Sequence, residues 1–320
     1  MPQPSVVNIA GLSTPLPRPM PGAAVARSRH AGLFFLVGPG IVRVEWDGSG
    51  LTYSDVVSRE QYPIVGAAAV YDDARASIVT IGGKVEGTDF FHLKIQEWSI
   101  GDGRLIGELD MPCLRTGMGA IRHRDRTLAI SGQAPNGQKL PDGIAIHAAG
   151  DDGLVGDDVA ERDLYWVDDT GTSAGGMQLP QIVVTKRPGE HRRVLVLNTG
   201  TPHAFEIVQR QGGPRLLTAR DVPMPPQKEG AACPLFDGRG FACAEGINAN
   251  NDPSDRLILW AGDGTPVVAA ERLPKSLHAP ALLPIDDRRF VVTGGETGVV
   301  PMRAGNSEEN VEAFLVTCAA

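Results

Sequence analysis

The amino-acid sequence predicts an all-β fold: a six-bladed β-propeller of four-stranded blades, closed by the N-terminal strand. A short apolar run that ends in glycine recurs six times along the 320 residues. Glycine (39 residues) and proline (25 residues) are abundant without forming a low-complexity run, which indicates many tight turns. No amphipathic helical pattern of ten or more residues interrupts the series. Repeats of four short strands are typical of a propeller.

The recurring glycines set the length of the repeat. Their mean interval is about 51 residues, which is enough for four short strands and their turns. The apolar run before each glycine, such as residues 78–81 or 290–293, predicts the second strand of a blade. The six landmarks are Gly38, Gly82, Gly132, Gly200, Gly246 and Gly294.

A second landmark predicts the first strand of a blade. Gly22, Gly66, Gly230 and His278 each stand 16 residues before a landmark glycine. Most of the residues that follow them are small, as in the alanine-rich segments 23–26 and 67–69. Small side chains suit the innermost strand of a blade, where the blades converge on the axis.

A third landmark predicts the third and fourth strands. Trp46, Trp98 and Trp260 each precede an Asp-Gly turn, and residues 152–153 and 212–213 supply glycine turns at the corresponding place in two other repeats. Such a turn between two apolar runs indicates a hairpin.

We expect a single domain, residues 1–320. The two ends of the chain are expected to share the last blade and so to close the ring. The last repeat stops after its third strand, residues 310–316, and residues 5–10 form a strand with no repeat of its own. We therefore expect the N-terminal strand to complete the last blade and remove its exposed edge. The expected blades are 15–58, 59–111, 112–167, 168–222, 223–273 and 274–320 plus strand 5–10.

Composition excludes several classes of protein. The net charge of −8 disfavours a nucleic-acid binder, which needs a basic surface. No apolar run approaches 18 residues, so no membrane span is expected. The N-terminus shows no signal peptide as written, which favours the cytoplasm unless the sequence begins at a mature extracytoplasmic part. The sequence leaves the oligomeric state open.

Two repeats resemble those of the kelch-repeat family. The resemblance lies in Ile81-Gly82-Gly83 with Trp98 downstream, and in Thr293-Gly294-Gly295 after residues 282–284. It covers nearly the whole chain, although the other four repeats lack the double glycine and Phe91 stands where the family has tyrosine. The resemblance implies a propeller whose strand 2–3 loops and inter-blade loops share one face around an axial funnel, here called the funnel face.

The funnel face is where the resemblance places a binding site. Its loops are longer and more polar than the opposite turns, and loops on a rigid scaffold commonly carry binding residues. The expected ligand-binding residues are Arg18, Lys84, Arg115, Gln133, Lys228, Glu229, Asn248, Lys275, His278 and Glu296.

No local motif assigns a catalytic residue, metal or cofactor. The G-x-S-x-G string at residues 171–175, which contains Ser173, is followed by Gly176 and Pro180, so the helix of a nucleophile elbow cannot form. Residues 169–172 resemble an aspartic-protease motif, but residues 198–201 offer no second carboxylate.

Metal sites have no better support in the sequence. The acidic turn 151–158 matches no EF-hand, and the seven histidines lack zinc-ligand spacing. No tyrosine stands in a context that matches the copper site of galactose oxidase.

Three hypotheses for function remain. The first is a non-catalytic scaffold that engages a protein or glycan through the funnel face, by analogy with the family. The second is a sugar-modifying enzyme of mutarotase or epimerase type, with Arg115, Glu229 and His278 gathered at the axis. The third is a structural component of a cell envelope. A central pocket with convergent charged groups favours a small-ligand site, whereas a flat, wide face favours a partner.

The four cysteines form no C-x-x-C motif, but two of them raise the question of a disulfide. If Asp237 pairs with Arg239 around Gly238, Cys233 faces Cys243 directly across two strands, within reach of a bridge. A slip of one residue sends the thiols to opposite faces. Two buried free thiols are the alternative.

Overall fold

The structure is a computed structural model, and it describes 13 ranges of the chain. Every regular element in these ranges is a β-strand and none is a helix, so the predicted all-β class is confirmed. No helix of the described part could span a membrane. The ranges are residues 5–20, 22–123, 126–140, 142–147, 159–165, 179–186, 192–197, 203–210, 213–223, 229–248, 252–261, 266–298 and 307–319.

The described strands form six four-stranded antiparallel sheets, most of them in simple up-and-down order. The first sheet contains β2 (Ala24–Arg27), β3 (Leu33–Gly38), β4 (Gly40–Trp46) and β5 (Leu51–Val57). The second contains β7 (Ala68–Asp72), β8 (Ser77–Ile81), β10 (Lys94–Ser99) and β11 (Leu105–Asp110). The third contains β12 (Gly119–His123), β13 (Arg126–Ile130), β14 (Asp142–His147) and β15 (Val159–Tyr165).

The next two sheets repeat this order, and the last one draws on both ends of the chain. The fourth contains β16 (Gln181–Lys186), β17 (Arg192–Leu197), β18 (His203–Arg210) and β19 (Gly213–Pro223). The fifth contains β20 (Ala231–Leu235), β21 (Gly240–Ala244), β22 (Ser254–Ala261) and β23 (Pro266–Leu277). The sixth contains β24 (Ala281–Pro284), β25 (Arg289–Thr293), β28 (Ala313–Ala319) and β1 (Ser5–Gly11).

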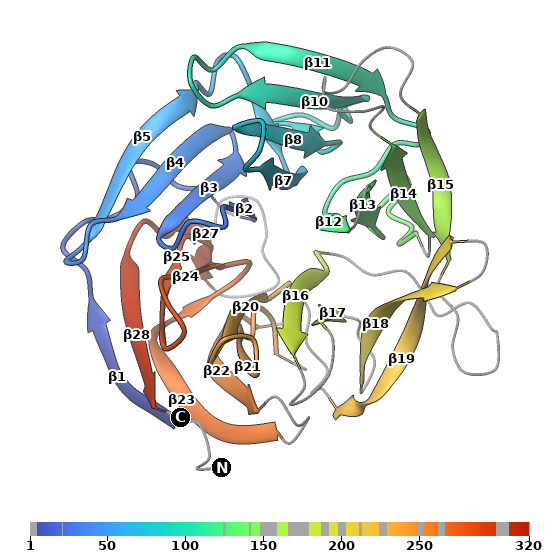
Figure 1. The fold of residues 1–320 in the computed structure, drawn as a ribbon. Coiled ribbons are helices and arrows are strands. Elements are labelled where there is room, and N and C mark those ends of the chain that lie inside the picture. The colour runs from blue at the N-terminus through green and yellow to red at the C-terminus, as the bar shows by residue number, and fades with distance from the viewer. Residues whose placement is uncertain are drawn as a thin grey trace.

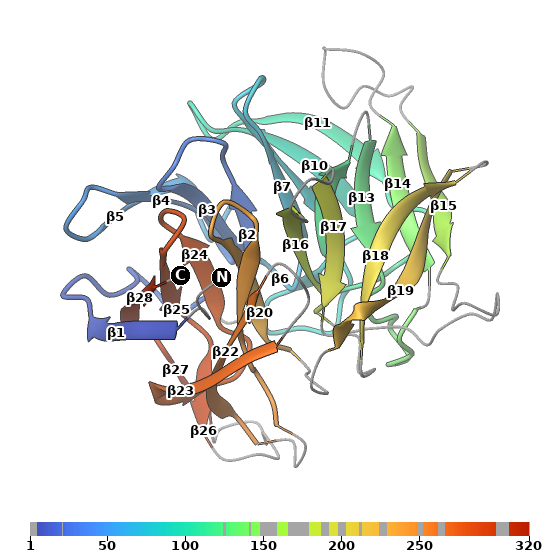
Figure 2. The ribbon, with the colours of Figure 1, turned by 60° about the horizontal axis from the view of Figure 1, so that its bottom comes forward.

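The sheets are arranged around a common centre, with the innermost strands nearest to it (Figure 1), as expected for propeller blades. The strand β1 pairs with β28, with Ser5 opposite Ala319 and Gly11 opposite Phe314. Two short ribbons extend the loops: β6 (Ile64–Val65) pairs with β9 (Lys84–Val85), and β26 (Glu296–Gly298) pairs with β27 (Ser307–Glu309). The β26–β27 ribbon projects beyond the last sheet (Figure 2).

Six apolar clusters hold the sheets together, and each lies between two neighbouring sheets. Phe35 of the first sheet packs in one cluster with Ile78 of the second, and Leu36 of the first packs in another with Leu283 of the sixth. The remaining clusters join the second sheet to the third, the third to the fourth, the fourth to the fifth and the fifth to the sixth. Each of the six sheets is therefore joined to two others by buried apolar side chains.

The residue that enters each innermost strand has a left-handed backbone. Four hydrogen bonds link successive residues of this set: Gly117 N–H donates to Gly66 O, Leu179 to Gly117, Ala279 to Glu229, and Gly22 to Ala279. The sequence landmarks coincide with this set at Gly22 and Gly66 but fall one residue late at Gly230 and one early at His278. The set is Gly22, Gly66, Gly117, Leu179, Glu229 and Ala279.

The β20–β21 hairpin corrects the register on which a disulfide depended. Cys233 pairs with Ala242 and Cys243 pairs with Ala232, one residue away from the required alignment. The cause is a four-residue turn in which Phe236 and Asp237, as well as Gly238, have positive φ. Neither cysteine forms a disulfide, and the two thiols lie in different apolar clusters, one on each face of the sheet.

Candidate functional site: an axial cavity

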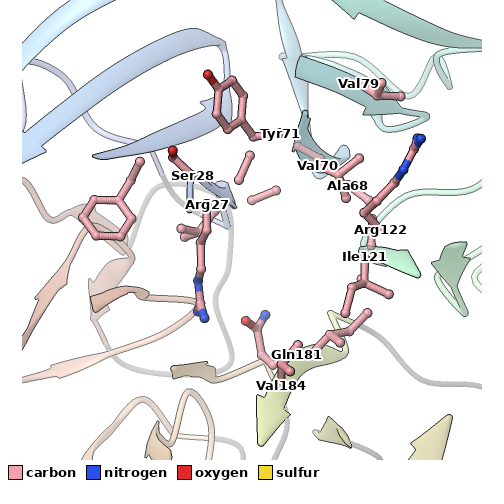
Figure 3. Close-up of a pocket in the computed structure, with 18 of the residues that line it drawn as sticks. Arg27, Ser28, Ala68, Val70, Tyr71, Val79, Ile121, Arg122, Gln181 and Val184 are labelled. Atoms are coloured by element: carbon pink, nitrogen blue, oxygen red, sulfur yellow. The ribbon is translucent and has the colours of Figure 1, made fainter. Parts of the chain in front are cut away.

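A cavity of about 1010 Å³ lies where the innermost strands converge. All six innermost strands, β2, β7, β12, β16, β20 and β24, contribute to its wall. Figure 3 labels lining residues from four of them, β2, β7, β12 and β16. Its volume follows from the sequence of these strands, because glycine and alanine occupy much of the wall and leave the middle unfilled. The small residues include Gly22, Ala24, Ala68, Gly119, Ala120, Ala231 and Ala281.

The backbone makes this wall polar. Each innermost strand pairs on one side only, with β3, β8, β13, β17, β21 or β25. Its other edge carries N–H and C=O groups that have no strand partner. Such groups need water or a ligand to complete their hydrogen bonds. The wall therefore combines small apolar side chains with alternating donors and acceptors.

Arg27, the last residue of β2, is a cationic group in this wall. It is half-buried, and its Nη2 donates to the carbonyl oxygen of Ala232, 2.7 Å away on β20. Its Nε and Nη1 make no hydrogen bond and are not among the buried atoms, so they remain accessible. Burial lowers the pKa of the guanidinium, and the adjacent Cys233 thiol partly opposes that shift. The group nevertheless stays charged, as arginine does in proteins.

Gln181 extends into the cavity from β16 (Figure 3). Its side chain makes no hydrogen bond to the described part of the chain and is half-buried. Since a carboxamide both donates and accepts, Gln181 offers a polar ligand a second side-chain contact.

Charged side chains gather at the end of the cavity formed by the turns after the innermost strands. Asp73 accepts from the Ser28 hydroxyl at 2.5 Å and from the Arg29 backbone N–H at 3.0 Å. Glu97 accepts from Arg75, 3.0 Å away. Asp72, the third carboxylate at this rim, accepts from the Ala74 backbone N–H at 3.0 Å, and none of the three forms an ion pair with Arg27.

None of the nine predicted ligand-binding residues that the structure describes lines this cavity. The funnel-face loops do meet one another, as the β-bridges Thr116–Gln133 and His278–Glu296 show. The cavity wall instead runs along the innermost strands to the charged turns at their other end. The useful sequence signal for Arg27 was its position directly after the small-residue strand, and Gln181 had no comparable signal.

Three of the predicted residues form one cluster. His278 contacts Glu229 through Nε2, and its Nδ1 lies 3.7 Å from a carboxylate oxygen of Glu296. Burial tends to lower the pKa of His278, but the two carboxylates outweigh it and raise the pKa to about 9. The cluster ties the approaches to β20 and β24 to the loop after β25.

Arg115 is buried and holds neighbouring backbone segments together. Its side chain is fully buried, donates to the carbonyl oxygens of Ser131 and Asp142 at 3.0 Å, and pairs with the Asp142 carboxylate at 3.1 Å. Its Nη2 also lies 2.7 Å from the Cys113 sulfur. The guanidinium therefore joins the segment before β12 to the residue after β13 and to the start of β14, and it is not part of the His278 cluster.

The other predicted residues mostly have local partners. Arg18 pairs with Asp55 at 2.8 Å, Lys84 with Asp89 at 3.1 Å and Lys275 with Glu312 at 2.6 Å. Gln133 donates to Gly137 O at 3.0 Å, and Asn248 accepts from Asp252 N–H at 3.0 Å. Lys228 and segments 151–158, 169–175 and 198–201 lie outside the described residues. No group of three or more metal-ligating side chains occurs in the described part.

Comparison with known proteins supports the architecture. No family model matches the chain, and no curated protein matches it. The solved structure of YjhT is similar, with a TM-score of 0.65 over 97% of this chain and 99% of that one, at 12% sequence identity. At this identity the likeness shows the fold alone.

Proposed function

We propose that the protein is a kelch-like propeller of six blades, closed by β1, which binds a small polar ligand in its axial cavity. Six four-stranded sheets and the β1–β28 pairing support the blade count and the closure. The observation that carries the function is the cavity itself. Its wall is contributed by every innermost strand and contains accessible groups on Arg27 and Gln181.

A small ligand fits this geometry better than a macromolecular partner would at the same place. The cavity matches the upper range of small-molecule sites, about 300–1,000 Å³. A flat interface would instead need roughly 800 Å² from each partner. Binding requires no catalytic group. The enzyme alternative expected Arg115 to lie beside His278, but Arg115 pairs with Asp142 instead.

The experiment is to equilibrate the protein with a cellular metabolite extract, wash it and identify retained small molecules by mass spectrometry. Gln181→Trp should abolish retention, because the indole fills space without breaking a protein hydrogen bond. Val7→Trp is the matched control, since Val7 on β1 is 64% exposed and far from the cavity wall. Equal retention by all three proteins would overturn the proposal.

One observation favours a second function, docking of a protein partner on the funnel face. Phe90 and Leu93, in the loop between β9 and β10, are 76% and 52% exposed. Exposed apolar side chains in one loop can mark an interaction site. Partner binding on this face should be lost in Phe90→Ser/Leu93→Ser and kept in Leu105→Ser/Ile106→Ser, whose apolar side chains are exposed on β11. Equal binding by both double variants would exclude the loop.

A further inference from the structure

We propose that the axial cavity recognises a hydroxyl-rich small molecule through one anionic group, and that Arg27 is the residue that reads this anion. This inference rests on the proposed small-ligand function. It adds the chemical class of the ligand and the residue that selects it.

The first step concerns the charge of Arg27. No described carboxylate forms an ion pair with it, and the Ala232 carbonyl uses only one of its five N–H donors. Because Arg27 is half-buried and its Nε and Nη1 remain accessible, a counter-charge inside the cavity can reach it. A carboxylate or phosphate group from a ligand satisfies both the charge and the free donors, in the paired geometry that guanidinium groups favour.

The second step concerns the other charges that line the cavity. Three carboxylates line the cavity, and none of them forms an ion pair with Arg27. Glu97 pairs with Arg75, Asp73 lies 3.9 Å from Arg29 Nε, and Asp72 accepts from the Ala74 backbone N–H. Arg122 also lines the cavity, and its one hydrogen bond goes to the Thr127 hydroxyl, 3.4 Å away. The described lining therefore offers cationic groups that lack carboxylate partners, which favours an anion.

The third step concerns the remainder of the ligand. The unpaired edges of six strands present N–H and C=O groups in alternation, and Gln181 adds one further donor and acceptor. A hydroxyl group can donate and accept at the same time, so hydroxyl-rich molecules suit such a wall better than purely apolar ones. Sugar acids and sugar phosphates both combine this body with one anion.

The test uses probes that differ only in the anion. Binding of D-glucuronate, D-glucose 6-phosphate and D-glucose is measured by isothermal titration calorimetry at low ionic strength, where ion pairing is least screened. We expect the anionic sugars to bind at least tenfold more tightly than glucose. Whichever anionic sugar binds more tightly identifies the preferred anion, carboxylate or phosphate.

The variants separate recognition from folding. Arg27→Gln should lose at least tenfold in affinity for the anionic sugar while glucose binding and the melting temperature change little. Arg27→Lys should retain part of the affinity, because lysine keeps the positive charge but lacks the paired N–H donors of the guanidinium. Arg104→Gln is the matched control, since Arg104 is exposed on the β10–β11 turn and outside the cavity wall.

Two results would overturn the inference. Equal affinities for glucuronate, glucose 6-phosphate and glucose, or unchanged anion binding in Arg27→Gln, would show that Arg27 does not select the ligand while leaving a cavity site intact. Absence of binding by all three probes to the wild-type protein would reject the sugar-anion class. The proposed function is tested separately by the metabolite experiment. It fails if Gln181→Trp retains the same small molecules as the wild-type protein, or if the wild-type protein retains none.

Discussion

The backbone N–H of Gly22 donates to the carbonyl oxygen of Ala279, 3.3 Å away, and so joins the entrance of β2 to that of β24. These residues are 257 positions apart in the sequence, yet their bond is of the same kind as those that link Gly117 to Gly66 and Leu179 to Gly117. The first and last sheets are therefore neighbours in space. This contact and the β1–β28 pairing are the physical basis of the proposed closure.

Deleting residues 1–11 should destabilise the protein. The deletion removes the six pairs between β1 and β28 and the packing of Val6 and Ile9 on the cluster between the fifth and sixth sheets. We expect the melting temperature to fall by several degrees, since about 1 kcal/mol corresponds to about 2–4 °C in domains of 150–250 residues. Differential scanning calorimetry measures this change. A synthetic peptide of residues 1–12 should restore stability, and an unchanged melting temperature would contradict closure by β1.

Gly246→Ala should be strongly destabilising for a steric reason. A Cβ atom at this position would lie 2.0 Å from the carbonyl oxygen of Glu229, a backbone atom that cannot move aside without shifting the inter-blade approach. We expect a loss of about 2 kcal/mol or more. Gly11→Ala is the control, because a Cβ there meets nothing within 4 Å. Chemical denaturation of both variants checks this prediction, and equal stabilities would argue against the close approach.

The His278 cluster should make stability depend on pH. Its pKa is about 9 in the folded protein and about 6.5 in the unfolded chain, so its stabilisation is complete below pH 6.5 and disappears as pH rises through 9. After allowance for solvent screening, we expect a loss of about 1–2 kcal/mol over this interval. Urea denaturation at pH 6 and pH 10 should show the loss in the wild type and a smaller one in His278→Gln. The same pH dependence in both proteins would contradict the assignment.

Arg115 should act on stability rather than on ligand affinity at the axial cavity. Replacing it by alanine removes the guanidinium that pairs with the buried Asp142 carboxylate and donates to the carbonyl oxygens of Ser131 and Asp142. Removing one partner of a buried pair typically costs about 3–5 kcal/mol. We therefore expect Arg115→Ala to unfold at lower urea concentration, while any protein that remains folded retains its cavity ligand. If Arg115→Ala has wild-type stability but no longer binds the cavity ligand, Arg115 acts in binding and this prediction is wrong.

The sequence predicted the strands well because their signals are local. The apolar runs before Gly82 and Gly294 lie on β8 and β25, and the alanine-rich segments lie on β2 and β7. Details that depend on three-dimensional packing were missed. The left-handed residues Leu179 and Ala279 have no sequence signature, and the four-residue turn at Phe236 shifted the cysteine register by one position.

The site could not be read from the sequence for a related reason. The groups that line the cavity come from six separate strands, so Arg27 and Gln181 stand in its wall from segments about 150 residues apart without forming a motif. The polar loops of the funnel face offered a stronger local signal, and the prediction therefore favoured residues such as Lys84 and Lys275. Their role in binding stays a prediction.

The most direct measurement is the location of a bound ligand, obtained from a crystal structure of the protein with the molecule retained from the metabolite extract. The account predicts electron density inside the axial cavity, with an anionic group at Arg27 and a polar contact to Gln181. Density on the funnel face, beside Lys84 or the His278 cluster, with an empty axial cavity would contradict it.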